Sequence, residues 1–323
     1  MADTYPRLVG DVGGTNARFA WIEADGAPLS DADTLPAATY PTLLDAIRAY
    51  LAGHAKPAPR WCAIGIANPV LGDHVQMTNH HWSFSIAGMQ RELGLDRLLV
   101  LNDFSALALA LPALRPDDVR QVGGGQALAG APLALLGAGT GLGVAGLVPA
   151  AGGHRAIPLP GEGGHVSLAG TGEREDAVIA ALRRRFGHAS AERAVSGQGI
   201  ENLHQALCEL SGEPPAGLDA AEIARRGTSG ADARCAEAMD LFFGFLGTVA
   251  GNLALTLGAR GGVYVGGGIV PRLGDAIDRS RFRAAFEAKG RMRPYVAAIP
   301  TFVLEARLSP ALTGAARALD DLD

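Results

Sequence analysis

Apolar and polar residues alternate in short blocks along the first half of the chain, and each block has the period of a strand or of a helix. Short continuous apolar runs mark buried strands, and apolar residues spaced three and four apart mark helices. On this pattern we predict strands at 7–12, 17–23, 61–67 and 98–101, and helices at 41–52 and 104–111. A glycine turn joins the first two strands, so we expect them to form a hairpin.

The second half of the chain repeats this alternation. It predicts strands at 133–136, 142–148, 263–265 and 301–304, and helices at 175–186, 199–210, 220–225, 231–257 and 311–319. Asp219 is the expected N-cap of the helix that starts at 220. Alternating strands and helices predict an α/β protein. Because 323 residues are many for one hydrophobic core, we expect two lobes, with ligands at strand ends in the cleft between them.

The charge and cysteine content exclude several classes of protein. Nucleic-acid binding needs a basic face, but the formal net charge is −5. The tight basic run Arg183-Arg184-Arg185 lies on a predicted helix and fits a solvated face. Three scattered cysteines are too few for a disulfide framework or a metal cluster and suit the reducing cytosol. We therefore expect a cytoplasmic protein without a nucleic-acid partner.

One uncharged stretch, 241–259, has the length of a membrane span. It contains Asn252 and three closely spaced glycines, Gly244, Gly247 and Gly251. These residues fit a helix that packs tightly inside a protein better than a helix in lipid. Charged residues also interrupt any apolar run at the start of the chain, which argues against a signal peptide. We expect no membrane partner.

Glycine is about twice as frequent as usual, at 44 residues, and is gathered in short clusters. Three clusters follow apolar strands: GDVGGTNAR from Gly10, GAGTGLG from Gly137 and GGGIVP from Gly266. Glycine lets the backbone approach a ligand closely, and consecutive N–H groups form a cradle for anions. Thr15 and Thr140 add hydroxyl donors. Any one cluster could be a simple hairpin turn, but the three together favour nucleotide phosphates.

Two common nucleotide motifs are not the explanation. The P-loop motif G-x-x-x-x-G-K-[ST] is absent, because no Gly-Lys-Ser or Gly-Lys-Thr occurs. The dinucleotide motif G-x-G-x-x-G matches 141–146, but that motif must open a helix. Here a predicted strand follows and leads to Pro149, so we reject the match.

Two carboxylates each have a structural and a chemical interpretation. Asn102-Asp103 lies where a predicted strand meets a helix, so either residue could be an N-cap. Alternatively, Asp103 could accept the proton of a ligand hydroxyl while Asn102 hydrogen-bonds a neighbouring hydroxyl. Asp11 ends a predicted strand beside the first glycine cluster. It could cap backbone N–H groups in the turn or hold Mg²⁺ through water.

The sequence PGEGGH brings Glu162 and His165 together in a glycine-rich loop. Metal binding would need further ligands at a standard spacing, and none is near in the sequence. A carboxylate and an imidazole suit a polyhydroxy ligand, because each hydroxyl both donates and accepts a hydrogen bond. A structural histidine remains the alternative. With the glycine clusters and Asp103, these residues point to phosphoryl transfer from ATP to a small sugar.

The chain resembles the bacterial glucokinases of the actin–hexokinase–heat-shock ATPase superfamily. The resemblance runs through LVGDVGGTNAR, MTNHHWSFS, LNDFSALALA, GAGTGLGVA, PLPGEGGHV, SAERAVSG, GGVYVGGGIVPR and FRAAFEAKGR. The zinc-binding cysteine cluster of ROK sugar kinases is absent from the sequence. The resemblance implies a two-lobed actin/hexokinase-like, ribonuclease H-like α/β fold with an inter-lobe cleft. It also implies a small domain at 1–112 plus 304–323, a large domain at 113–303, and a homodimer.

The resemblance also assigns roles to residues. Asp103 would take the proton of the glucose 6-hydroxyl, and other hydroxyls would contact Asn102, Glu162, His165 and Glu192. Glu192 reads from the residues alone as an ordinary exposed glutamate. The ATP phosphates, with Mg²⁺, would lie against Gly10, Asp11, Val12, Gly13, Gly14, Thr15, Gly139, Thr140 and Gly141, and the adenosine against Gly266, Gly267 and Gly268.

Two other functions stay open at the level of sequence. One is a kinase for another hexose or an amino sugar, since rejection of an epimer depends on geometry. The other is a sugar-binding regulator without turnover. The sequence also leaves open whether ATP, ADP or polyphosphate is the donor, and whether Asn68 or Asn79 contacts the sugar.

Overall fold

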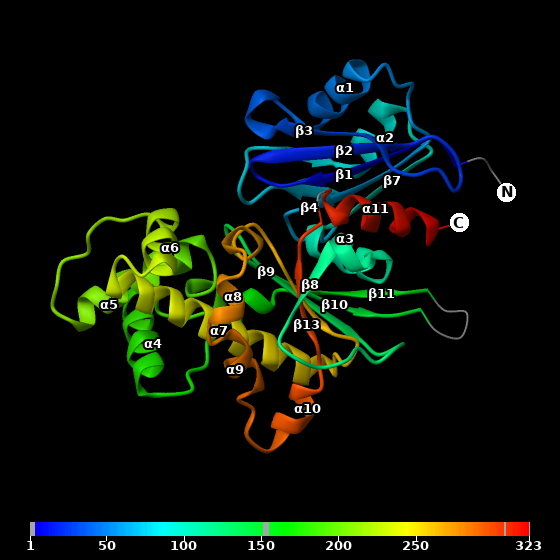
Figure 1. Ribbon diagram of the computed structural model, residues 1–323. Helices are drawn as coiled ribbons and strands as arrows, with labels where there is room; N and C mark the ends of the chain where they lie inside the picture. Colours follow the sequence, from blue (N-terminus) through cyan, green and yellow to red (C-terminus); the bar gives the residue numbers. More distant parts are fainter. Residues whose placement is uncertain (1–3, 151–154, 307, 323) are drawn as a thin grey trace. The chain divides into compact units, whose positions relative to one another are not determined.

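A computed structural model of the chain describes residues 4–150, 155–306 and 308–322. Figure 1 shows the order of its helices and strands. Contacts within the chain divide it into two compact units. Unit 1 comprises Met1–Arg115, Ala150–Pro160 and Ala306–Asp323, and unit 2 comprises Pro116–Pro149 and Gly161–Glu305.

Unit 1 is built on a five-stranded sheet with the order β3-β2-β1-β4-β7. Its strands are β1 (Arg7–Val12), β2 (Asn16–Ile22), β3 (Ser30–Pro36), β4 (Trp61–Ile66) and β7 (Arg97–Asn102). The first three form antiparallel pairs, whereas β1, β4 and β7 run parallel. A separate antiparallel pair joins β5 (His74–Gln76) to β6 (Ser83–Ser85).

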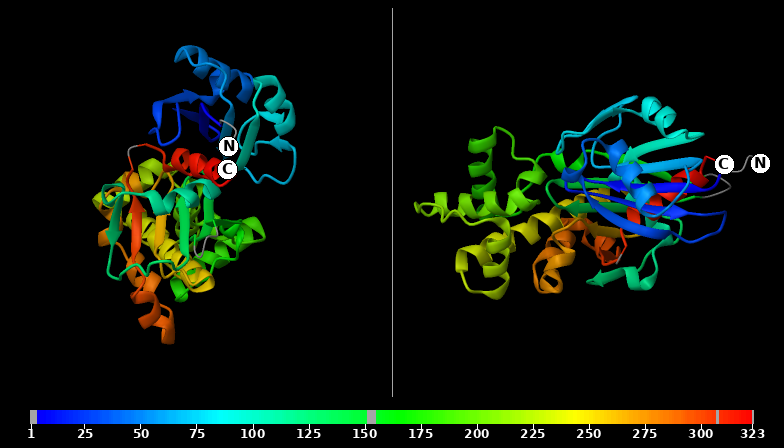
Figure 2. Two further views of the ribbon diagram at one scale, coloured as in Figure 1. Left: turned by 90° about the vertical axis from the view of Figure 1, so that its right-hand side faces the viewer. Right: turned by 90° about the horizontal axis from the view of Figure 1, so that it is seen from above.

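Helices cover both faces of this sheet: α1 (Leu43–Gly53) and α2 (Ile86–Leu93) on one face, α3 (Asp103–Ala110) and α11 (Pro310–Asp320) on the other (Figure 1, Figure 2). Strand residues alternate between the two layers, as the period of two requires. On β1, Leu8 packs in the core with α1 and α2, while Val9 packs in the core with α11. The last helix of the chain is therefore part of the same unit as the first strand.

The contact between α3 and α11 depends on a glycine. A Cβ placed on Gly314 would lie 2.6 Å from the carbonyl carbon of Ala106 in α3, and closer still to its oxygen. On the sheet side, a Cβ on Gly65 of β4 would lie 3.0 Å from the Cβ of Ala106. Glycines on both sides thus allow α3 to lie close to the sheet and to α11.

The second large sheet has six strands in the order β11-β10-β9-β12-β13-β8, and all of them except β11 lie wholly in unit 2. The strands are β8 (Val119–Val122), β9 (Leu133–Ala138), β10 (Leu142–Val148), β11 (Ile157–Gly161), β12 (Val263–Gly266) and β13 (Thr301–Leu304). Strands β9 and β10 are antiparallel, and β9, β12 and β13 are parallel. Apart from β8, the spatial order is third, second, first, fourth, fifth in both sheets.

The helices of unit 2 are α4 (Glu173–Phe186), α5 (Gly197–Leu210), α6 (Ala220–Ser229), α7 (Ala233–Leu257), α8 (Ala276–Arg279), α9 (Phe282–Glu287) and α10 (Arg293–Ala297). Short 3₁₀ turns in the chain lie at Ala37–Thr39, Leu111–Ala113, Pro116–Asp118, Gly163–His165, Ala191–Arg193, Pro271–Leu273 and Gly290–Met292. Apolar residues of α4, α5 and α7 form one large core with β9, β10 and β12.

Helix α7 runs through this core. Within the described part of the chain it is the one helix long and apolar enough to cross a membrane, but 78% of its most apolar window is buried inside the structure. Its glycines let α9 approach closely. A Cβ on Gly247 would lie 3.0 Å from the carbonyl carbon of Phe282, and one on Gly251 would lie 2.5 Å from the oxygen of Phe286. The helix is therefore packed as an internal helix of unit 2.

All the strands and helices predicted from the hydrophobic pattern are present, with ends that differ by up to about four residues. Asp219 is the N-cap of α6, accepting from the Glu222 N–H at 2.8 Å. Residues 142–148 are a strand, so the dinucleotide-type match opens no helix and its rejection is confirmed. The elements not predicted are short or polar: β3, β5, β6, β8, β11, α2, α8, α9 and α10.

Candidate active site

The junction of β7 and α3 carries the expected base. Asn102 Oδ1 accepts from the N–H groups of Phe104 and Ser105 at 3.0 and 3.1 Å, so Asn102 is the N-cap of α3. Asp103 Oδ1 accepts from the Asn102 amide at 3.0 Å and from the Phe104 N–H at 2.9 Å. Of the two interpretations given by sequence, the cap belongs to Asn102. Asp103 is the first residue of the helix, half-buried, with its carboxylate oriented by its neighbour.

The register of the sheet brings this junction near the first glycine cluster. Val12 pairs with Ile66, and Ile66 pairs with Asn102, so the ends of β1, β4 and β7 lie level at one edge. Neighbouring strands are about 4.8 Å apart, which puts the backbones of Val12 and Asn102 about 10 Å from each other. Unit 1 therefore presents the glycine turn and the Asp103 carboxylate along one sheet edge.

The first glycine cluster is partly strand and partly turn. Gly10, Asp11 and Val12 lie in β1, and the turn itself is Gly13 to Thr15. The Gly13 N–H donates to the Asn16 carbonyl at 2.9 Å, which closes the hairpin. A Cβ on Gly14 would lie 2.7 Å from the carbonyl oxygen of Asn79. The hairpin and cradle interpretations are thus compatible, because the turn is tight and its backbone is bare of side chains at both glycines.

The two asparagines left open by the sequence lie near this turn. Asn68 Oδ1 accepts from Thr78 at 3.1 Å (N–H) and 2.6 Å (Oγ1), so its side chain joins two loops of unit 1. The backbone of Asn79 packs on Gly14. The Asn68 side chain and the Asn79 backbone thus help to shape the strand-end loops.

Asp11 is held by two side chains. Its Oδ2 accepts from Arg18 Nη1 at 3.1 Å and from Ser309 Oγ at 2.7 Å, and its side chain is 14% exposed. Among the described residues no group of three or more His, Cys, Asp and Glu side chains could hold a metal ion. Mg²⁺ keeps several waters and often takes only one or two carboxylates beside substrate phosphates. A single, nearly buried carboxylate beside the glycine turn fits that kind of site, with water between Asp11 and the ion.

In unit 2 the second and third glycine clusters are neighbours. Gly137 of β9 pairs with Gly266 of β12, so the turns that follow begin side by side. The second turn, Gly139 to Gly141, is closed by the Gly139 N–H donating to the Gly141 carbonyl at 2.8 Å. In the third, Gly267 has φ +81°, and a Cβ there would lie 2.7 Å from the backbone nitrogen of Ala138. Only glycine fits that position without strain.

Glu162 precedes the 3₁₀ turn Gly163–His165 that follows β11, and His165 is its last residue. Their side chains are 64% and 62% exposed, with Glu162 Oε2 and His165 Nε2 3.9 Å apart. Gly163 and Gly164, between them, lie against β10: a Cβ on Gly163 would be 2.8 Å from Val144 Cγ1. The turn is therefore fixed on the sheet while its two polar side chains remain accessible to a ligand.

Glu192 is not the exposed residue that its sequence suggests. It is half-buried in the turn Ala191–Arg193, and its Oε2 accepts from the Leu142 N–H at 3.0 Å. Leu142 directly follows the second glycine turn. The structure thus joins Glu192 to a loop 50 residues earlier in the chain. Only the segment SAERAVSG, through its resemblance to known proteins, could have indicated it.

Each unit collects its own members of the predicted set. Unit 1 holds the first glycine turn, Asp11, Asn102 and Asp103 along one sheet edge. Unit 2 holds the other two glycine turns, Glu162, His165 and Glu192, around the starts and ends of β9, β10 and β12. Every residue expected at the site lies in one of these two groups.

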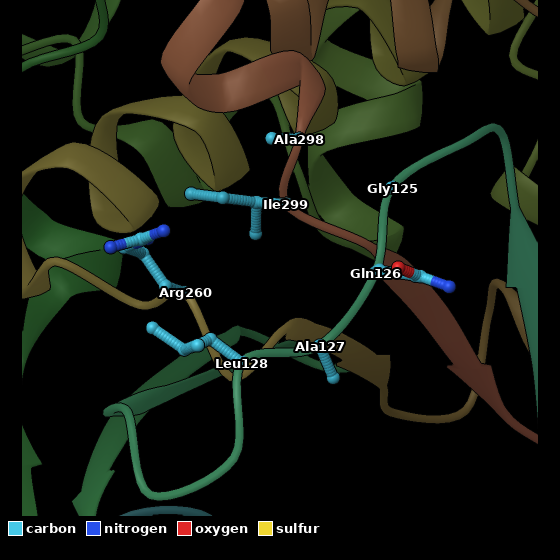
Figure 3. A pocket seen from close by; sticks show the side chains of 7 residues that line it. All are labelled: Gly125, Gln126, Ala127, Leu128, Arg260, Ala298 and Ile299. Atoms are coloured by element: carbon cyan, nitrogen blue, oxygen red, sulfur yellow. The ribbon is translucent and has the colours of Figure 1, made fainter.

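A separate hollow of about 500 Å³ occurs elsewhere in unit 2 (Figure 3). Its lining is largely apolar and backbone: Gly125, Gln126, Ala127, Leu128, Arg260, Ala298 and Ile299. In Figure 3 the Gln126 side chain points away from its centre. Arg260 is the charged residue in the lining, and none of the predicted site residues contributes. The hollow has no group that could act as a base, so it is not the candidate active site.

Known proteins match this chain over nearly its whole length. A family model described as "Glucokinase" matches residues 8–322. A glucokinase of Aromatoleum aromaticum is 56% identical over 321 residues, covering 99% of this chain and 96% of its own. The crystal structure of a glucokinase from an Antarctic psychrotroph superposes with a TM-score of 0.88 at 36% identity, covering 98% of this chain and 99% of that one.

A more distant structure shares the fold. A ROK family glucokinase from Streptomyces griseus, solved in complex with glucose and AMPPNP, has a TM-score of 0.64 at 18% identity, covering 97% of this chain and 99% of its own. The α/β architecture with a repeated sheet pattern is thus that of the hexokinase-like sugar kinases.

Proposed function

The chain belongs to the glucokinase family and phosphorylates glucose with ATP, and on this premise we propose that Asp103 is the general base. Asp103 takes the proton of the glucose 6-hydroxyl as that oxygen attacks the γ-phosphorus. The new O–P bond forms while the bond from the γ-phosphorus to the departing ADP breaks. The observation that supports this role is the level ending of β1, β4 and β7, which leaves the Asp103 carboxylate beside a glycine turn.

The ATP site is assigned to the three glycine clusters. The phosphates lie against Gly13, Gly14 and Thr15 and against Gly139, Thr140 and Gly141, with Gly10, Asp11 and Val12 forming the strand end beneath. The adenosine lies against Gly266, Gly267 and Gly268. Bare backbone at these turns suits close contact with anionic oxygens. Mg²⁺ bound with ATP would neutralise the phosphate charge, held through water by Asp11.

The sugar hydroxyls are assigned to Asn102, Glu162, His165 and Glu192. Their carboxylate, amide and imidazole groups accept and donate, as polyhydroxy ligands require. Because the chain is 56% identical to a glucokinase over 99% of its length, we favour a kinase over a sugar-binding regulator without turnover. If these groups match the hydroxyls of glucose, the enzyme prefers glucose to other hexoses. A sugar that leaves one of these polar groups unpaired in the complex binds more weakly.

The remaining proposals concern assembly and location. We propose a cytoplasmic location, in line with the three scattered cysteines, and a homodimer, in line with the family resemblance. Units 1 and 2 would act as the small and large domains, with functional boundaries at 1–112 plus 304–323 and at 113–303. Sedimentation analysis tests the dimer: a single monomer peak at micromolar concentration would contradict it.

The base is tested by Asp103→Asn. The asparagine Oδ1 can still accept from the Phe104 N–H, so the start of α3 is kept while the proton acceptor is lost. We expect glucose 6-phosphate formation with Mg²⁺-ATP to fall by about 10²- to 10⁴-fold in kcat. Glucose binding, measured by calorimetry, should stay within a few-fold. A normal kcat in Asp103→Asn would show that Asp103 is not the general base. In a separate experiment, initial rates over a panel of hexoses would measure the preference for glucose.

A further inference from the structure

At the start of β10, the unit 2 residues assigned to the sugar lie next to the unit 2 residues assigned to the phosphates. The Leu142 N–H donates to Glu192 Oε2 at 3.0 Å, and Leu142 is only 6% exposed. Its neighbour Gly141 has no room for a side chain, because a Cβ there would overlap Glu192 Oε2 and lie 3.2 Å from Cδ. The carboxylate of Glu192 thus rests directly on the second glycine turn.

A second connection holds the same two segments together. The Gly197 N–H donates to the Gly139 carbonyl at 2.9 Å, at the other end of the turn. Ser196 Oγ donates to the Glu192 carbonyl at 2.8 Å and accepts from the Gly199 N–H at 2.9 Å, which caps α5. The segment from Glu192 to the start of α5 is therefore fixed at both ends on Gly139–Leu142.

The turn that carries Glu162 and His165 packs on the same strand end. A Cβ on Gly164 would overlap the carbonyl oxygen of Leu142 and lie 3.1 Å from its carbon. Leu142 thus contacts Glu192 through its N–H and the Glu162–His165 turn through its carbonyl. Leu142 therefore contacts the segments that carry all three proposed sugar ligands of unit 2, and it directly follows the proposed phosphate turn Gly139–Gly141.

We propose that Glu192 is a positioning residue that couples glucose binding to nucleotide binding. Its Oε2 fixes the Gly139–Gly141 turn, and its Oε1, which accepts no hydrogen bond from another described residue, accepts from a sugar hydroxyl. A sugar that orders this carboxylate also orders the turn, and by reciprocity a nucleotide that orders the turn favours the sugar. This coupling rests on the proposed assignment of the two sites.

Two effects of the carboxylate have opposite signs and can be separated. The hydrogen bond to Leu142 holds the turn and strengthens nucleotide binding, whereas the negative charge repels phosphates. Glu192→Ala removes both, while Glu192→Gln keeps an acceptor oxygen and removes the charge. If positioning dominates, the alanine variant loses nucleotide affinity and the glutamine variant does not.

The first experiment perturbs the nucleotide side and measures the sugar. Gly141→Ala displaces the end of the Glu192 side chain without forcing a positive φ, and Gly139→Ala, whose added Cβ comes no nearer than 4.0 Å to another residue's atom, is the matched control. With no nucleotide present, we expect the glucose Kd to rise roughly 5- to 10-fold in Gly141→Ala, in line with the loss of one typical hydrogen bond. The control should stay within 2-fold. Equal glucose affinities in the two variants would overturn the coupling.

The second experiment perturbs the sugar side and measures the nucleotide. With Mg²⁺ and no glucose, the AMPPNP Kd should rise roughly 5-fold in Glu192→Ala and stay within 2-fold in Glu192→Gln and in His165→Ala, whose imidazole does not touch the turn. Unchanged or tighter AMPPNP binding in Glu192→Ala overturns the proposal. If that variant does not fold, a 5-fold loss in Glu192→Gln overturns it instead. Both assays measure binding, so their outcomes do not depend on whether the wild-type protein phosphorylates glucose. The turnover assay tests the proposed function separately.

Discussion

Replacing Gly314 by alanine tests the claim that α3, which begins with Asp103, is held against α11 by close backbone packing. The added Cβ would lie 2.6 Å from the Ala106 carbonyl carbon, whereas ordinary contacts start at 3.4 Å. The helices must therefore separate by at least 3.4 − 2.6 = 0.8 Å. A backbone group cannot rotate away as a side chain can, so the separation affects the whole contact.

The expected cost follows from this geometry. Overpacking of a well-packed core costs about 1–3 kcal/mol, and the rigid obstacle here puts Gly314→Ala at about 3 kcal/mol of unfolding free energy. Buried α11 residues such as Leu312 and Leu319 would lose part of their contact with the sheet. Because a misplacement of about 1 Å at a reacting group can cost about 10²-fold in rate, kcat should fall as well as stability.

Urea unfolding followed by circular dichroism, with a coupled assay for glucose 6-phosphate, measures both effects. Gly53→Ala is the matched control: it is also a glycine on a helix of unit 1, and its added Cβ meets no atom within 4 Å. That variant should be unchanged or more stable by up to about 1 kcal/mol, since alanine favours helix. If Gly314→Ala and Gly53→Ala unfold at the same urea concentration, the packing argument fails.

Three further outcomes are expected. Thr42→Ala removes the α1 N-cap, whose Oγ1 accepts from the Asp45 N–H, and should cost about 1 kcal/mol in urea unfolding with kcat unchanged. Burial lowers the pKa of His204, so as the pH falls through about 6.5 the unfolded state binds a proton before the folded state does. The melting temperature should therefore fall as the pH is lowered from 8 to 5, and it should fall less steeply in His204→Gln. Gly267→Ala strains a positive φ and should raise the KM for ATP and lower the melting temperature, whereas Gly268→Ala has open space and should leave the melting temperature unchanged.

The sequence predicted the elements whose periodicity is set by burial. β4 and the centre of β1, Leu8 to Gly10, are apolar on both faces because helices cover both, and their runs were recognisable for that reason. β3 could not be predicted, since Ser30–Pro36 is mostly exposed and has no apolar alternation. It is a strand because β2 offers it hydrogen bonds at the sheet edge, and that partner is a tertiary feature.

The candidate site was predictable where chemistry is local. Asn102 and Asp103 share a strand–helix junction, so the sequence itself offered both a cap and a base, and the structure gives the cap to Asn102. Glu192 was different, because its partner is a backbone N–H 50 residues away. No local pattern around Glu192 encodes that contact. The role of Glu192 was predicted only from the resemblance to known proteins. The structure supplies a physical reason for it, the hydrogen bond from the Leu142 N–H.

The glycines of α7 have a consequence for the order in which the chain folds. Each glycine inside a helix weakens it by about 1 kcal/mol relative to alanine, so α7 is a poor helix until α9 covers Gly247 and Gly251. On the ribosome, α7 is complete at Leu257, and α9 begins 25 residues later, at Phe282. At about 5–20 residues per second, this strongly apolar segment waits one to several seconds for its partner. Nascent chains halted between these two points should be the ones that aggregate or recruit chaperones.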